Sequence, residues 1–158
     1  MSDHNLIEGK PKLDNAKVTV VASRFNSFIV DRLLDACLGT LKKSGVPDRD
    51  ITIVRVPGAF EIPSTVQHVI KYSECDAVIA LGAVIRGETP HFEYISSECI
   101  RGLGQLSIEN DIPVIFGVLT VDNTEQAMDR AGTEESNKGS ESAQAALEMI
   151  NVFRTLTQ

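Results

Sequence analysis

Several patterns that would assign a function directly are missing from this sequence of 158 residues. It contains no P-loop, no His-Glu-x-x-His zinc motif and no Gly-x-Ser-x-Gly nucleophile motif. It also has no apolar run long enough to span a membrane. The function must therefore be inferred from weaker signals and from their order along the chain.

An excess of positive charge is also missing. The chain has 15 Lys and Arg against 22 Asp and Glu, a net charge of −7. Nucleic acids and anionic membranes bind proteins through a basic surface, so we expect neither as a partner. Because the net charge would also repel an anionic small molecule at long range, any phosphate site must carry local positive charge.

Cysteine is scarce, and its spacing excludes the common cysteine frameworks. Cys37, Cys75 and Cys99 are odd in number and widely spaced, with no Cys-x-x-Cys pair. This pattern is typical of reduced core thiols and predicts a cytoplasmic protein, without a disulfide framework or a zinc site. The outlying histidines His4 and His68 offer no metal set, so we expect no metal.

The chain divides into a short arm and one domain. The first residues are polar and lack a hydrophobic signal region. We expect residues 1–16 to form a flexible arm that could dock on a neighbouring subunit. Residues 17–158 are expected to form a single α/β domain, since a chain of this size buries roughly 70% of its unfolded surface.

Four apolar segments predict buried β-strands. They are rich in Val and Ile and nearly continuous, as expected of strands covered on both faces of a parallel sheet. These segments are residues 18–22, 51–56, 77–85 and 114–121.

Between and after these strands, apolar residues recur every three or four positions, which predicts amphipathic helices. The helical segments are residues 30–41, 62–72, 92–106, 124–131 and 143–153. Their order favours a flavodoxin-like three-layer α/β/α sandwich with a central four-stranded parallel sheet. Ligands of such sheets bind beyond the carboxyl ends of the strands. The candidate segments are therefore residues 23–26, 57–61, 86–91 and 122–138.

Residues 86–91 carry the strongest chemical signal. Thr89 and Pro90 precede an apolar stripe, which predicts a helix with Thr89 as N-cap and Pro90 at its first position. The amino end of a helix attracts anions, and its dipole would keep the ring of His91 neutral and able to accept a proton. A surface histidine without a role fits the same position. Glu88 would have to turn away from a bound anion.

The other segments offer binding groups, each with a plainer structural alternative. Phe25 could stack on a planar heterocycle, although the spacing also fits a phenylalanine at the core edge. Residues 58–61 could hydrogen-bond a sugar-like hydroxyl chain or cap the next helix. Arg130 and Lys138 could supply the local positive charge, and an arginine fork matches phosphate. The helix dipole alone also favours an arginine at a helix carboxyl end.

Five motifs at these positions resemble those of one family. Residues 82–94 (Gly-Ala-Val-Ile-Arg-Gly-Glu-Thr-Pro-His-Phe-Glu-Tyr) look like a signature of the lumazine synthase (6,7-dimethyl-8-ribityllumazine synthase) family. The other four motifs, in family order, are residues 22–26, 57–61, 116–120 and 130–139. The resemblance runs from about residue 17 to residue 156, and the five motifs in order are highly specific.

The resemblance implies a reaction and an assembly. The family condenses 5-amino-6-(D-ribitylamino)uracil with 3,4-dihydroxy-2-butanone 4-phosphate. The products are 6,7-dimethyl-8-ribityllumazine, phosphate and water, in the penultimate step of riboflavin biosynthesis. No cofactor or metal is expected. A homo-oligomer is expected, either a pentamer or a multiple of pentamers.

The resemblance also implies a role for each site residue. His91 would transfer protons, Phe25 would stack on the pyrimidine and Glu61 would hold ribityl hydroxyls. The full set expected at the pyrimidine and its ribityl chain is Phe25, Ala59, Phe60, Glu61, Ala83, Val84, Ile85, Phe116 and Lys138. The set expected at the butanone phosphate is Glu88 (through its backbone), Thr89 and Arg130. Among these, the adjacent subunit would supply Phe116, Arg130 and Lys138, together with Glu141.

Two other interpretations stay open. A different enzyme on this fold, such as a carboxyaminoimidazole mutase with a catalytic histidine, would not need Phe25 and Phe116 as stacking partners. A non-catalytic carrier or shell protein that binds lumazine or flavin would keep these aromatic residues. It would have no use for His91 together with Arg130.

Overall fold

The computed structural model describes residues 3–13 and 15–158. The described strands form one parallel sheet in the order β2-β1-β3-β4. They are β1 (Val18–Ser23), β2 (Ile51–Val56), β3 (Ala77–Ile85) and β4 (Val114–Val121). The fold is the predicted flavodoxin-like α/β sandwich. Three strands have the predicted bounds, and β1 extends one residue further, to Ser23.

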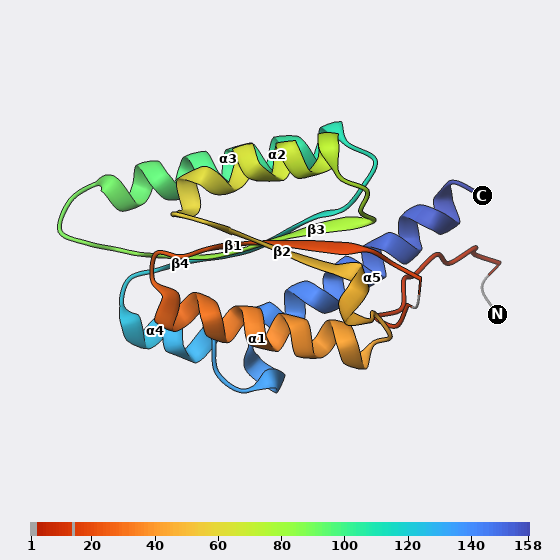
Figure 1. Ribbon diagram of the computed structural model, residues 1–158, viewed down its shortest axis with the longest axis horizontal. Helices are drawn as coiled ribbons and strands as arrows, with labels where there is room; N and C mark the ends of the chain where they lie inside the picture. Colours follow the sequence, from red (N-terminus) through yellow and green to blue (C-terminus); the bar gives the residue numbers. More distant parts are fainter. Residues whose placement is uncertain (1–2, 14) are drawn as a thin grey trace.

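Two helical layers enclose the sheet (Figure 1). One layer contains α1 (Ser27–Lys43), α4 (Thr124–Arg130) and α5 (Lys138–Leu156). The other contains α2 (Ile62–Tyr72) and α3 (His91–Glu109). Helices α1, α3 and α5 extend beyond the predicted segments, because an apolar stripe marks only those turns that face the sheet.

The central strand β3 feeds both layers of the core. Its residues are buried from Ala77 to Val84. Successive side chains of a strand point to opposite faces. Ile79 and Leu81 therefore pack in the cluster under α1 and α5, while Val78 and Ala80 pack in the cluster under α2 and α3. This arrangement explains why the strand is apolar without alternation.

Helices α1 and α5 approach each other closely where α5 begins. A Cβ atom on Gly139 would lie 1.9 Å from the carbonyl oxygen of Leu33, so only glycine fits at this contact. The Asn137 side chain accepts a hydrogen bond from the Gly139 N–H at 2.7 Å, and the hydroxyls of Thr40 and Ser140 are 2.9 Å apart. These contacts fix the first turn of α5 against α1.

The three cysteines are free thiols, as predicted. Cys37 lies in the core cluster under α1 and α5, and Cys99 lies in the cluster under α2 and α3. Burial raises the pKa of Cys37 to about 12 and that of Cys99 to about 11. Cys75 is only partly buried, so the prediction of a core thiol is wrong for this residue.

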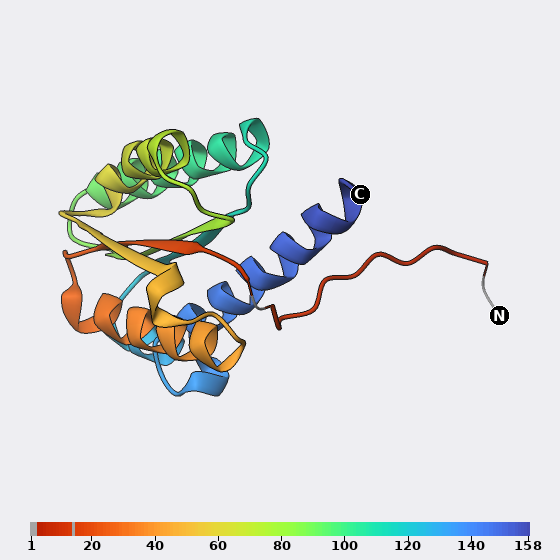
Figure 2. The same cartoon turned by 45° about the vertical axis from the view of Figure 1, so that its right-hand side comes forward.

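Residues 3–13 precede the sheet without forming a helix or a strand. Figure 2 shows this segment running away from the sheet. Residues 1, 2 and 14 of the predicted arm lie outside the described residues. None of the helices in the described ranges combines the length and apolar character that a membrane span requires.

Candidate active site

A cavity of about 660 Å³ opens at the carboxyl ends of the strands, beside the beginning of α3. We call it the strand-end cavity. It collects most of the predicted site residues, including His91 and Thr89. The complete lining is Phe25, Pro57, Gly58, Ala59, Phe60, Glu61, Ala83, Val84, Ile85, Gly87, Thr89, His91, Phe92 and Ile95.

The turn that carries Phe25 is tied to two neighbouring strands. The Phe25 N–H donates to the Pro57 carbonyl at 3.0 Å. Asn26 adopts the left-handed conformation, with φ of 61°, and its side-chain amide donates to the Ala83 carbonyl at 2.8 Å. Asn26 is thus the N-cap residue of α1, but its side chain does not cap the helix. Phe25 is 71% exposed, which excludes the core-edge role, and it lines the strand-end cavity.

Glu61 lies where the short 3₁₀ helix η2 (Ala59–Glu61) leads into α2. It occupies the N-cap position of α2, yet its side chain makes no capping hydrogen bond. Its backbone carbonyl accepts instead from the Thr65 hydroxyl at 2.8 Å. The carboxylate is therefore left to line the strand-end cavity, where it can accept hydrogen bonds from ligand hydroxyls.

The predicted start of α3 is wrong by one residue. The helix begins at His91, and Pro90 is the N-cap residue. The carbonyl of Pro90 accepts from the N–H groups of Glu93 and Tyr94, at 3.1 and 3.4 Å, which makes Pro90 the last residue before the helix. The Thr89 hydroxyl makes no cap and lines the cavity instead. His91 is the first helical residue and borders the same cavity.

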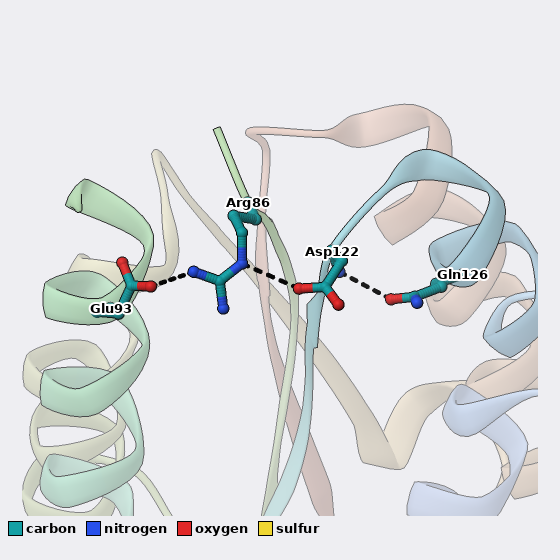
Figure 3. A network of polar contacts seen from close by, with 4 residues as sticks. All are labelled: Arg86, Glu93, Asp122 and Gln126. Atoms are coloured by element: carbon teal, nitrogen blue, oxygen red, sulfur yellow. Dashed lines mark hydrogen bonds and ion pairs between the residues drawn. The ribbon is translucent and has the colours of Figure 1, made fainter. Parts of the chain in front are cut away.

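Arg86 organises the loop between β3 and α3, a role that the sequence analysis missed. Its Nε donates to the Asp122 carboxylate at 2.9 Å, and a second guanidinium nitrogen donates to Glu93 (Figure 3). Its guanidinium also lies over the Phe92 ring, 4.4 Å from the centroid. Hydrogen bonds to Asp122 and Glu93 raise the pKa of Arg86, while the bond from Arg86 lowers the pKa of Glu93.

The sequence did contain a signal for this contact. The register of the sheet pairs Ile85 of β3 with Val121 of β4. The residues that directly follow them, Arg86 and Asp122, must therefore emerge side by side with opposite charges. An arginine and an aspartate that directly follow neighbouring parallel strands are a recognisable pattern once the strand order is known.

A second pocket, of about 350 Å³, lies along the edge strand β4. We call it the edge pocket. It brings together the four residues that the resemblance assigned to an adjacent subunit: Phe116, Arg130, Lys138 and Glu141. Lys138 pairs with Glu141 at 2.7 Å, and Arg130 donates to the Gln126 carbonyl at 3.0 Å. Glu88 lines neither the edge pocket nor the strand-end cavity.

The charges of the two pockets differ. The described residues that line the strand-end cavity include no Lys or Arg, whereas the edge pocket carries Arg130 and Lys138. Within residues 3–13 and 15–158, no three or more His, Cys, Asp and Glu side chains cluster in a way that could hold a metal ion.

The fold and the strand-end cavity define the class: an α/β protein with a cavity of small-molecule size at the carboxyl ends of its parallel strands. Within that class, the model of the 6,7-dimethyl-8-ribityllumazine synthase family matches residues 15–154, nearly the whole chain. The chain belongs to this family, whose activity is of the transferase type.

Proposed function

We propose that this protein catalyses the condensation of 5-amino-6-(D-ribitylamino)uracil with 3,4-dihydroxy-2-butanone 4-phosphate. The products are 6,7-dimethyl-8-ribityllumazine, phosphate and water, and the reaction belongs to riboflavin biosynthesis. One observation carries the proposal. In a chain of this family, an open aromatic face, an uncommitted carboxylate and a histidine border a single cavity.

The pyrimidine substrate occupies the strand-end cavity. Its ring stacks on Phe25, and the apolar strand end at residues 83–85 lines the other side. Ala59 and Phe60 flank the ribityl chain, and Glu61 accepts hydrogen bonds from its hydroxyls. A cavity of about 660 Å³ is in the usual range for a small-molecule site.

The butanone phosphate binds beside Thr89 and the amino end of α3, with the backbone of Glu88 as a further partner. First-turn N–H groups of a helix lack intrahelical acceptors and favour an anion. The chain is acidic and its strand-end cavity has no lysine or arginine among the described lining residues, so a cation must come from elsewhere. Arg130 of a neighbouring copy supplies it.

We therefore propose that two chains form each site. The edge pocket of one copy packs over the strand-end cavity of the next and adds Phe116, Arg130 and Lys138. Two different surfaces meet in such a heterologous contact, which closes into a ring when the rotation permits. The proposed assembly is a homopentamer or a multiple of it. Free thiols favour a reducing compartment, and we place the enzyme in the cytoplasm.

The chemistry follows from this placement. The pyrimidine amine attacks the butanone carbonyl and forms an imine with loss of water. His91 assists the proton transfer that accompanies departure of phosphate, and the enol rearranges. The ribityl-bearing nitrogen then attacks the carbonyl that this rearrangement forms, and loss of a second water closes the ring. Holding two reactants in one site supplies several kcal/mol, and acid–base catalysis by His91 adds a factor of about 10²–10⁴.

One assay tests this function. The purified protein is mixed with both substrates while lumazine fluorescence and released phosphate are recorded together. We expect both signals to rise in equal amounts, and neither to rise above the protein-free rate with one substrate alone. Binding of the pyrimidine without any turnover would contradict the enzyme and support the non-catalytic carrier.

A further inference from the structure

We propose that Arg86 is a positioning residue that holds the first turn of α3, and with it His91, at a fixed place relative to the end of β4. This inference rests on the proposed function, because it assigns Arg86 a role in that reaction. Arg86 borders neither pocket. Its effect is exerted through the residues that it links.

The position of Arg86 is fixed by the sheet. Its backbone N–H donates to the Val121 carbonyl at 2.9 Å, which extends the pairing of β3 with β4 by one residue. The guanidinium leaves this anchored backbone and lies between Glu93 on α3 and Asp122 at the end of β4 (Figure 3). A planar guanidinium can donate to two carboxylates at once in a defined geometry.

The first turn of α3 depends on this contact because it has no cap of its own. The N-cap residue is Pro90, which makes no side-chain capping hydrogen bond, and the preceding residues 86–90 are exposed. Arg86 contacts the two residues that follow His91, through the ring of Phe92 and the carboxylate of Glu93. It thus restrains both the position of this turn along the helix axis and its rotation about that axis. The imidazole of His91 is carried by the same turn.

The same network continues towards the edge pocket. The Asp122 backbone N–H donates to the Gln126 side chain at 2.8 Å, and the Gln126 carbonyl accepts from Arg130 at 3.0 Å. A row of hydrogen bonds therefore joins the first turn of α3 to the residue that we assign to phosphate binding. Arg86 joins the α3 end of this row to Asp122.

A role in geometry fits Arg86 better than a role in stability. Its side chain is 44% exposed, and ion pairs at that exposure stabilise a fold only weakly. Small displacements of a reacting group, in contrast, lower turnover strongly. We therefore expect Arg86 substitutions to change catalysis much more than unfolding.

The test compares Arg86→Gln with Arg101→Gln, a control arginine that lies on α3 itself. Arg101 also donates two hydrogen bonds to a glutamate, at 3.2 and 2.8 Å, but that residue, Glu98, lies on its own helix. We expect Arg86→Gln to lower kcat about 10- to 100-fold, the cost of a displacement near 1 Å. Affinity for the pyrimidine, measured by titration, and the melting temperature stay near wild type. Arg101→Gln leaves kcat unchanged.

Two further variants separate position from charge. Arg86→Lys keeps the charge but cannot bridge both carboxylates, so it restores only part of the lost kcat. Glu93→Gln removes the negative charge from the arm to α3 alone but leaves an amide oxygen that can still accept, so it should reproduce part of the loss. Adding it to Arg86→Gln should then cost little more.

A failure of the positioning role can be told apart from a failure of the proposed function. A wild-type protein that makes no lumazine contradicts that function. An active wild type with Arg86→Gln and Glu93→Gln at normal kcat overturns the positioning role alone. So does a loss of kcat that merely follows a loss of folded protein. If Arg86→Gln does not fold, Glu93→Gln and Arg86→Lys decide by the same criteria.

Discussion

The strand-end cavity and the edge pocket of one chain carry different kinds of side chain. The first holds the exposed Phe25 ring and His91, and its described lining residues include no lysine or arginine. The second holds Arg130 and Lys138 beside Phe116, which is 45% exposed on the edge strand. In the proposed function, the cations that bind phosphate therefore lie on a different surface of the chain from the residue that transfers protons.

The two pockets are also built differently. The strand-end cavity consists of turns hydrogen-bonded to neighbouring strand ends, such as Phe25 to Pro57. The edge pocket depends on the end of α4 and the beginning of α5, which Gly139 seats against α1. Substitutions in the strand-end cavity should therefore change turnover, whereas those in the edge pocket should change anion affinity and stability.

The largest expected effect is that of His91→Ala in the strand-end cavity. We expect kcat to fall about 10²–10⁴-fold while measurable turnover persists, because proximity of the two reactants remains. His68→Ala is the matched control, since His68 lies exposed on α2 and contacts the Ser64 carbonyl. Complete loss of turnover in a folded, assembled His91→Ala protein would contradict the expectation that proximity of the two reactants supplies most of the rate enhancement.

Arg130→Ala in the edge pocket should act on one substrate only. Loss of a charge-assisted hydrogen bond to phosphate costs roughly 1.5–3 kcal/mol, which is about a 10- to 100-fold weaker affinity for the butanone phosphate. Pyrimidine affinity should stay within about twofold. Separate titrations with each ligand measure the difference. Equal losses of affinity for both ligands would argue against separate roles for the two pockets.

Gly139→Ala tests how the edge pocket is held. The new Cβ would overlap the Leu33 carbonyl, and overpacking of this kind costs typically about 1–3 kcal/mol. Gly104→Ala on α3 is the control, because nothing lies within 4 Å of its Cβ and alanine should raise stability by roughly 0.5–1 kcal/mol. Urea unfolding measures both. Similar stability changes in the two variants would remove the argument for close packing at the beginning of α5.

The smallest expected effect concerns Cys37, in the core layer under α1 and α5. Burial raises the pKa of Cys37 from 9.0 to about 12, so the unfolded chain loses this proton first as the pH rises. The protonated thiol makes its full contribution to the free energy of unfolding well below pH 9. This contribution falls by about 1.4 kcal/mol between pH 8 and pH 10. Unfolding free energies of wild type and Cys37→Ala, compared over that range, isolate this slope. Identical slopes would contradict it.

Much of the fold could be predicted because apolar patterns record burial directly. Continuous Val and Ile segments gave three strands their observed bounds, since both faces of a buried parallel strand exclude polar residues. The strand-end rule then located the cavity. Helix starts were less predictable. Thr89 and Asn26 are residue types that often cap helices, yet neither side chain does so here, and that of Asn26 donates to the Ala83 carbonyl instead.

The contacts of Arg86 could not be predicted from local pattern. They depend on which strands are neighbours and on their register, and both follow from the three-dimensional arrangement of the whole chain. The roles of individual residues in binding and catalysis remain predictions. The most specific of them is that Arg130 and His91, which line different pockets of one chain, act together in one site.

The most direct test is complementation between two crippled variants. One carries Phe25→Ala with His91→Ala, and the other carries Arg130→Ala with Lys138→Ala. Each is assayed alone and after co-refolding in equal amounts, with assembly checked by light scattering. If neighbouring chains share each site, random mixing in a ring restores about one quarter of the wild-type sites. Activity that stays at the mean of the two parents would place all these residues in a site within one chain and contradict the account.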